Sequence, residues 1–428
     1  MFKSKFWALL PLFTFIVLYL ATSLVLNDFY KMPVIVAFLV AALVGFGLYP
    51  RISFHQKTEE FSKGAGDPGI MLMILIFILA GAFAGLTKSI GAVDSTINFG
   101  LAYLSPRFLI AGLFLTACFI SLSLGTSVGT VVALSPIAVG MSESIPGSLA
   151  VSLGAVVGGA MFGDNLSMIS DTTIAATRTQ GVEMLDKFKV NFWIALPAAL
   201  ITFAIYSFAS PFQTSVPGEH AYSFLLIVPY VFVLAAALLG LHVIWVLISG
   251  IVLSLAIGLW QGNADIWNLV QSINSGMASM FELSVLCLII GGVVGLICYY
   301  GGIDYILTHV SRKVKGVRSG ELGIAALTAL VNATLANNTI TILIVGPLAK
   351  SIADKNGIDL RRSASILDTI SCFVQGLLPY GAQILAALAI ANQKITPLQL
   401  MSNLYYPYLL GASTLVFILF HRKVRAVS

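Results

Sequence analysis

Ten consecutive residues of this sequence carry two carboxylates, one amide and four hydroxyls. The run follows a glycine-rich apolar stretch and reads Asp164-Asn165-Leu166-Ser167-Met168-Ile169-Ser170-Asp171-Thr172-Thr173. Oxygen atoms of these groups are hard ligands that suit a small cation, and the carboxylates would balance its charge. The simpler alternative is an extramembrane loop in which Asp and Thr only cap a helix. We expect ion or substrate ligands at Asp164, Asn165, Ser167, Ser170, Asp171 and Thr172.

Three further polar interruptions fall in or next to apolar stretches. Two of them, at 125–130 and 336–341, carry the candidate ligands Thr126, Ser127, Asn337, Asn338 and Thr339. The third, at 375–383, brings no carboxylate but contains the helix breakers Pro379 and Gly381. Asp368 lies two turns before it and is a third candidate carboxylate, with a partnered structural acid as the alternative. Helix ends at such breaks direct backbone partial charges at a bound group, unless the small polar residues merely pack helices together.

Composition places these interruptions in a membrane protein. Of 428 residues, 58% are hydrophobic and 10% are charged, with a mean hydropathy of +0.97, whereas a soluble domain has roughly 25% charged residues. Apolar stretches of spanning length predict an all-α polytopic membrane protein with about 11 to 13 transmembrane segments in a lipid bilayer. We assign Lys187, Lys189 and the other basic residues behind the net charge of +5 to short loops that set orientation, so no nucleic-acid partner is expected.

A membrane location changes the interpretation of the acidic run. A carboxylate at the centre of a bilayer costs roughly 2.5–3.5 kcal/mol, so it persists mainly beside water or a ligand. In a continuous helix Asp164 and Asp171 would share one face, but Gly163 and the many hydroxyls favour an unwound segment. Two interruptions at corresponding places of a chain are typical of a transporter's central site.

The chain resembles itself at a nearly constant interval. Residues 85–94 match 295–304 at an offset of 304 − 94 = 210, and 126–130 match 337–341 at an offset of 211. Basic residues do not decide between parallel and inverted repeats, and we expect inverted repeats with broken or re-entrant helices. The predicted organisation is N-terminal helices and an interfacial segment at 1–66, a first repeat at 67–190, connecting helices at 191–275, and a second repeat at 276–428.

The acidic motif also carries a family resemblance. Gly-Asp-Asn-Leu-Ser-x-x-Ser-Asp-Thr-Thr at 163–173 resembles the signature of the NhaC-type sodium/proton antiporter family, part of the wider ion-transporter superfamily. The segments 375–383 and 336–339 resemble the branch of that group regarded as amino-acid permeases. The resemblance implies a prokaryotic cytoplasmic-membrane transporter and places Asp164, Ser167, Ser170, Asp171 and Thr172 near its transport site. Many antiporters of the family have Pro where this chain has Met168, and some have Lys where it has Asn165. The family also contains members that exchange organic acids or carry amino acids, so the resemblance leaves the substrate open.

Two versions of an ion-coupled secondary active transporter follow. In the antiporter, Asp164 and Asp171 bind transported Na⁺ and protons in turn; in the Na⁺- or H⁺-coupled permease they hold the coupling ion beside an amino acid. An enzyme is not expected, because the G-x-S-x-G match at 125–129 lies in an apolar helical run rather than a strand–turn–helix. A multi-subunit channel is disfavoured by the single duplication. No cofactor is expected, and a homodimer is one of the states that the sequence leaves open.

Overall fold

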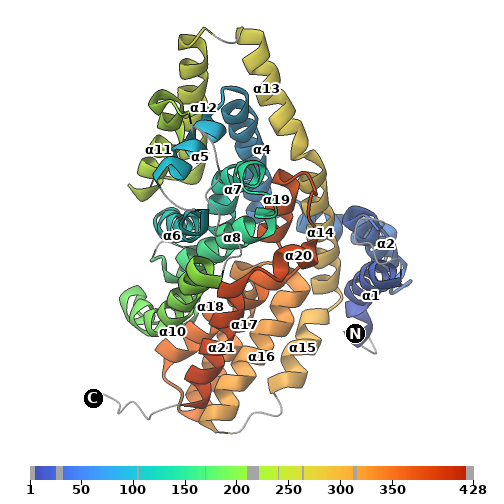
Figure 1. Ribbon diagram of the computed structural model, residues 1–428. Helices are drawn as coiled ribbons and strands as arrows, with labels where there is room; N and C mark the ends of the chain where they lie inside the picture. Colours follow the sequence, from blue (N-terminus) through green and yellow to red (C-terminus); the bar gives the residue numbers. More distant parts are fainter. Residues whose placement is uncertain are drawn as a thin grey trace.

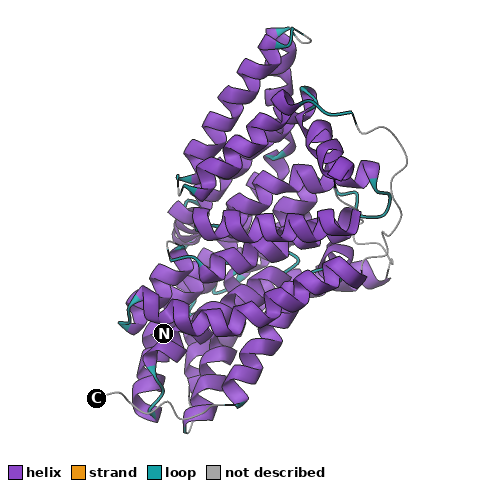
Figure 2. Cartoon of the chain, turned by 60° about the vertical axis from the view of Figure 1, so that its left-hand side comes forward, coloured by secondary structure: helices purple, strands orange, loops and turns teal. Residues whose placement is uncertain are grey.

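The computed structural model describes residues 5–25, 32–103, 106–168, 170–209, 221–239, 241–262, 265–311 and 316–420. Every regular element among these residues is a helix, and no strand occurs in them (Figure 2). Six helical stretches are long and apolar enough to cross a membrane, and five shorter apolar helices accompany them in the described part of the chain. The prediction of an all-α polytopic membrane protein is confirmed.

The helices fall into four consecutive groups. The first group is η1 (Lys5–Leu9), α1 (Leu10–Val25), α2 (Val34–Gly47) and α3 (Phe54–Ala65). The second is α4 (Pro68–Ser89), α5 (Ala92–Tyr103), α6 (Pro106–Leu124), α7 (Ser127–Ser144), α8 (Leu149–Leu166) and α9 (Asp171–Gln180). The third is α10 (Met184–Ala204), the π-helical turn η2 (Ile205–Ala209), α11 (Phe224–Leu238) and α12 (Val243–Trp260). The last is α13 (Ile266–Ser279), α14 (Phe281–Tyr299), α15 (Gly302–Ser311), α16 (Val317–Leu335), α17 (Asn338–Asn356), α18 (Leu360–Leu377), α19 (Ala382–Ile390), α20 (Pro397–Met401) and α21 (Tyr405–Leu419).

Local sequence signals explain several of these boundaries. Asp67 caps α4 by accepting from the Gly69 amide at 2.9 Å, and Pro68 occupies the first turn, where its missing N–H costs nothing. Gly181 ends α9 with a left-handed φ of 73°, and Gly357 ends α17 in the same way at 68°. The helices are therefore set locally by caps, proline and glycine, while their apolar length places them in the bilayer.

Seven helices recur in order along the chain. Each of α13 to α19 begins 210 to 213 residues after its counterpart among α3 to α9, as for Phe54 and Ile266. The recurrence supports the predicted duplication and extends it to α3 and α13. We therefore propose that the repeated units begin with these helices, earlier than residues 67 and 276. The inverted orientation of the units stays a prediction.

The two proposed units exchange their first helices. α3 packs against α14 of the second unit, and α13 packs against α4 of the first; the latter pair lies side by side in Figure 1. Both crossings are made by glycines at close approach. A Cβ on Gly64 would lie 2.3 Å from the Gly291 carbonyl oxygen, and a Cβ on Gly276 would lie 2.1 Å from that of Gly81. These contacts bind the units together around one shared centre.

Candidate functional site

The four predicted interruptions all fall at helix ends. Thr126 caps α7 by accepting from the Gly129 amide at 3.4 Å, and Asn337 caps α17 by accepting from the Ile340 amide at 3.0 Å. Gly125 precedes the first of these caps with a φ of 66°, and Ala336 precedes the second with a φ of 49°. The left-handed backbone lets each chain turn sharply from one helix into the next.

The break in the acidic run lies four residues beyond the position that the sequence indicated. α8 continues through Gly163 to Leu166, and the chain is extended at Ser167 and Ser170 before α9 begins. Gly163 instead allows α8 to pack closely on α6, since a Cβ there would lie 2.4 Å from the Leu122 nitrogen. The expectation that Gly163 unwinds the helix is therefore wrong; the hydroxyl residues after Leu166 form the break.

Asp164 lies buried at this break and is bonded by two hydroxyls. Ser170 Oγ donates to Asp164 Oδ1 at 2.6 Å, and Ser127 Oγ donates to Asp164 Oδ2 at 2.8 Å. Ser170 also contacts the Thr172 hydroxyl at 2.7 Å and caps α9. No ion pair to the Asp164 carboxylate occurs among the described residues. Its charge is met only by hydroxyl dipoles, an arrangement that leaves the carboxylate available to a cation or a proton.

One chain of hydrogen bonds runs from Asp164 through all four breaks. Gln383 Nε2, at the start of α19, donates to Ser127 Oγ at 3.0 Å. Gln375 Nε2, near the end of α18, donates to Gln383 Oε1 at 3.1 Å and to the Ala336 carbonyl at 2.9 Å. The sequence marked 375–383 as a break but did not single out these glutamines. They occupy the positions opposite Asp164 and Thr172 at an offset of 211, so the second unit supplies amides where the first supplies a carboxylate and a hydroxyl.

A cavity of about 260 Å³ opens between these helix ends, and we call it the break cavity. Eight of the fourteen predicted site residues line it, namely Thr126, Ser127, Asp164, Asp171, Thr172, Asn337, Asn338 and Thr339. Gln383 and Asp67 line it as well, and α4 closes one side. The structure thus brings together residues from all four breaks, which lie up to 257 positions apart, from Thr126 to Gln383.

The lining of the break cavity is acidic. Asp171 stands exposed at the first position of α9 and has no hydrogen-bond or ion-pair partner among the described residues. The Asn338 amide nitrogen is buried without a partner in the same part of the structure. Asp67 adds a third carboxylate at the edge, and no lysine, arginine or histidine lies among the described lining residues. A cavity of this charge attracts cations and repels anions.

The other six predicted residues do not line the break cavity. Ser170 bonds Asp164, and the Ser167 carbonyl accepts from Thr173 Oγ1 at 2.7 Å. Pro379 and Gly381 shape the turn between α18 and α19, in which the Gly381 amide donates to the Leu378 carbonyl at 2.8 Å. These residues hold the breaks in shape. The remaining two are Asn165 and Asp368.

Asn165 and Asp368 belong to a buried cluster with Lys187. Lys187 Nζ lies 2.5 Å from Asp368 Oδ2, and both side chains are fully buried. Asn165 Nδ2 donates to the same oxygen at 3.0 Å, and Asn191 Nδ2 does so at 2.8 Å. The assignment of Lys187 to a surface loop is wrong, because its side chain turns from the first turn of α10 into the protein. Lys189, two residues on, is exposed, and no local sequence signal separates the two lysines.

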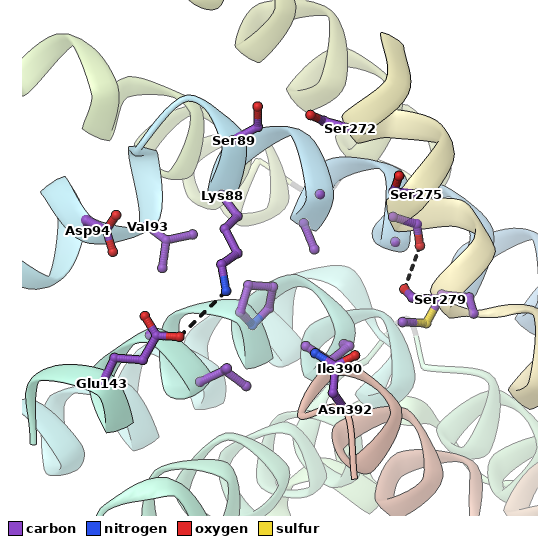
Figure 3. Close-up of a pocket in the computed structure, with 18 of the residues that line it drawn as sticks. Lys88, Ser89, Val93, Asp94, Glu143, Ser272, Ser275, Ser279, Ile390 and Asn392 are labelled. Carbon is purple, nitrogen blue, oxygen red and sulfur yellow. Dashed lines mark hydrogen bonds and ion pairs between the residues drawn. The ribbon is translucent and has the colours of Figure 1, made fainter. Parts of the chain in front are cut away.

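Larger cavities lie away from the breaks. One of about 500 Å³, between α4, α7 and α13, contains none of the predicted site residues (Figure 3). Lys88 reaches across it to Glu143 at 3.6 Å, and the two side chains are 68% and 47% exposed. We call it the α4–α13 cavity. Among the described residues no group of three or more His, Cys, Asp or Glu side chains is arranged to hold a metal ion.

Comparisons with known proteins add a family to this geometry. A model of the Na⁺/H⁺ antiporter family matches residues 2–210 and 220–421. The Na⁺/H⁺ antiporter NhaC of Alkalihalophilus pseudofirmus is 26% identical over 385 residues, covering 82% of this chain and 81% of that protein. The arginine/ornithine antiporter ArcD of Halobacterium salinarum is 22% identical over 373 residues, covering 78% and 77%. Among solved structures, the YdaH transporter of Alcanivorax borkumensis covers 85% of this chain and 87% of its own, at 15% identity and a TM-score of 0.43.

Proposed function

Because the chain belongs to the Na⁺/H⁺ antiporter family, whose members are secondary transporters, we propose that its ions exchange in the break cavity on Asp164. The observation that carries the proposal is the Asp164 carboxylate itself. It is buried at a helix break, faces the cavity and is bonded only by hydroxyls. A bacterial cytoplasmic membrane is the location that fits such a protein. Asp171 supplies the second charge at the cavity wall.

The hydroxyls around Asp164 suit both ions. Each hydroxyl has one donor and two acceptor lone pairs. Ser127 and Ser170 therefore stabilise the bare carboxylate by donating, as they do in this structure. When Na⁺ binds, the same oxygens turn lone pairs to the metal; when Asp164 is protonated, its O–H donates to one of them. Na⁺ and a proton thus compete for one group, and such competition couples the movement of the two ions.

An amino-acid substrate is the second candidate function. The N-termini of α7 and α17 lie at the break cavity beside carboxylates, so a zwitterion would find a partner for each of its charges. The similarity to an arginine/ornithine antiporter points the same way. The size of the cavity favours the ion. A volume of about 260 Å³ lies below the range of about 300–1,000 Å³ usual for organic ligands but admits a cation with several waters of about 30 Å³ each.

The central prediction concerns Asp164→Asn in proteoliposomes. The asparagine amide keeps the shape of the side chain and its contacts with the hydroxyls. It has no negative charge to balance Na⁺ and does not bind a proton, so Na⁺-dependent proton movement should fall by at least about 100-fold. A pH-sensitive dye inside the vesicles records it. Asp265→Asn, at an exposed helix start far along the chain, is the matched control and should transport like the wild type. Near-normal transport by Asp164→Asn would contradict the assignment.

The same vesicles separate the two functions. Labelled amino acids are supplied on one side, with Na⁺ gradients on or off. A dye signal without uptake or exchange of any amino acid supports the antiporter. Amino-acid counterflow that Asp164→Asn abolishes would assign the cavity to an organic solute and overturn the antiport proposal.

A further inference from the structure

The Lys187 cluster has no part in the ion exchange described above, although one of its members, Asn165, directly follows Asp164 in the sequence. It consists of Lys187 on α10, Asp368 on α18, Asn165 at the end of α8, Thr173 on α9 and Asn191 on α10. All five side chains are at most 1% exposed. A charge in such a place is retained only when its partners are complete, and this makes the contacts of Lys187 informative.

Each of the three ammonium protons has its own acceptor. Lys187 Nζ donates to the Asn165 carbonyl at 2.9 Å and to Thr173 Oγ1 at 2.8 Å. Its third partner is Asp368 Oδ2 at 2.5 Å. An ammonium group has three N–H donors, so the hydrogen-bonding capacity of Lys187 is used in full. One side chain therefore connects α8, α9 and α18, and with α10 it joins helices of both repeated units.

Two of these contacts fall on the edges of the α8–α9 break. The Asn165 carbonyl is among the last four of α8, which have no partner within the helix. Lys187 and Asn191 supply the missing donors, the latter at 3.0 Å. On the other side, Thr173 accepts from Lys187 and donates to the Ser167 carbonyl. The hydrogen bond from Ser170 to Asp164 spans the break between the end of α8 and the start of α9. Lys187 thus bonds to both of these helix ends.

We propose that Lys187 is a positioning residue of the cation site: paired with Asp368, it holds the α8–α9 break in the shape that presents Asp164 to the break cavity. The inference rests on the proposed function of that cavity. Lys187 is not among the residues that line the cavity and acts through the backbone of the break. Asp368 serves as the counter-ion of Lys187, which explains a carboxylate that the sequence placed near the site but that does not line it.

A second buried ion pair provides a comparison within the same protein. Arg362 Nε lies 2.6 Å from Glu321 Oε1, and the side chains are 8% and 0% exposed. Arg362 also packs over the Phe417 ring. The hydrogen bonds of Arg362 join α18 to α16 and α21 near the start of α18, at the opposite end of that helix from its break. Removing both of its charges tests what the loss of a buried ion pair does to the fold alone.

The test compares two double variants in proteoliposomes and in detergent. Lys187→Met with Asp368→Asn removes both charges of one pair, and Arg362→Met with Glu321→Gln removes both charges of the other. Because neither leaves a lone buried charge, both should fold. We measure the KM and maximal rate for Na⁺ and the hydrogen–deuterium exchange of peptides covering 163–175.

The Lys187/Asp368 variant should raise the KM for Na⁺ about tenfold with a maximal rate within about twofold of wild type, since the site is distorted but its groups are intact. Exchange at 163–175 should rise at least about tenfold, and neither quantity should change in the Arg362/Glu321 variant. Unchanged hydrogen–deuterium exchange, or equal changes in both variants, overturns the proposal.

Hydrogen–deuterium exchange can be measured whichever ion the protein transports. If the wild type shows no Na⁺ transport, that result therefore counts against the antiport function and not against the positioning role of Lys187. If the double variant does not fold, Asn191→Leu, which removes one donor to the Asn165 carbonyl, should raise the same exchange, and an unchanged value overturns the proposal.

Discussion

At the scale of single residues, the two buried carboxylates Asp164 and Asp368 differ in their hydrogen-bond and ion-pair partners. Asp164 and Asp368 are both buried carboxylates in helices that end at a break. Asp164 has only hydroxyl donors, whereas Asp368 has an ammonium and two amides. The first carboxylate keeps its charge available to a ligand, and the second has its charge neutralised within the protein. This contrast supports our proposal that Asp164 takes part in transport and that Asp368 has a structural role.

Gln383 offers a test of the hydrogen-bond chain through the breaks. Gln383→Met keeps the volume but removes the donor to Ser127, which is then free to rotate away from Asp164. We expect the KM for Na⁺ transport to rise about fivefold, which corresponds to the loss of one hydrogen bond of about 1 kcal/mol.

The matched control for Gln383 is Gln180, another buried glutamine that both donates and accepts hydrogen bonds. Its Nε2 donates to the Gly346 carbonyl at 2.8 Å and to Thr179 Oγ1 at 3.5 Å, and its Oε1 accepts from the Ser363 hydroxyl at 2.8 Å. Gln180→Met should also remove hydrogen-bond energy, so it should lower the free energy of unfolding by about 1 kcal/mol. It should leave the KM for Na⁺ unchanged. An equal rise of KM in both variants would show that the chain through Gln383 has no special connection with the site.

At the scale of helices, the exchanged pairs depend on glycine. α13 crosses α4, and α3 crosses α14, with backbone atoms in contact, so these crossings have no room for a side chain. Small residues at such crossings are typical of membrane helices, where dispersion and close approach replace the hydrophobic effect between them. The same glycines lie at 64 and 276, and at 81 and 291, which is the repeat interval again.

Gly276→Ala and Gly112→Ala should have effects of opposite sign. A Cβ at 276 meets the Gly81 carbonyl oxygen at 2.1 Å, whereas a Cβ at 112 on α6 meets nothing within 4 Å. The first change forces α13 from α4 and should destabilise the fold by about 1–3 kcal/mol. The second should stabilise by up to about 1 kcal/mol through helix propensity. Thermal unfolding of the two variants in one detergent measures both, and a loss of stability in Gly112→Ala matching that in Gly276→Ala would refute the close-contact argument.

At the scale of the whole molecule, two cavities border opposite ends of α4. Gly69 and Leu72 of α4 border the break cavity, and Gly85 and Lys88 border the α4–α13 cavity. α4 has 22 residues, a length of roughly 33 Å that matches a hydrocarbon core of about 30 Å. Buried apolar side chains such as Phe77, at 0% exposed, lie between the two groups. The two cavities are therefore expected to open toward opposite sides of the membrane.

Cysteine labelling tests this arrangement. Leu72→Cys and Ser89→Cys are made in a chain whose four native cysteines are replaced by alanine. Both positions are exposed, Leu72 at 37%. A membrane-impermeant maleimide added to one side of oriented vesicles should modify one variant, and added to the other side should modify the other. Modification of both from the same side would contradict a spanning α4 and, with it, the placement of the two cavities.

The sequence by itself determined the class of the protein, the four helix interruptions and the family. These are local properties: apolar length forces a helix through lipid, and Gly, Pro, Ser and Asn next to each other end it. It also selected eight residues that line one cavity, because polar groups at breaks have few other places to go. Only the tertiary structure decided which carboxylates line that cavity, that Lys187 is buried rather than in a loop, and that α3 and α13 exchange partners. Lys187 meets a partner 181 positions away, and such pairings depend on how distant helices pack, which no local pattern records.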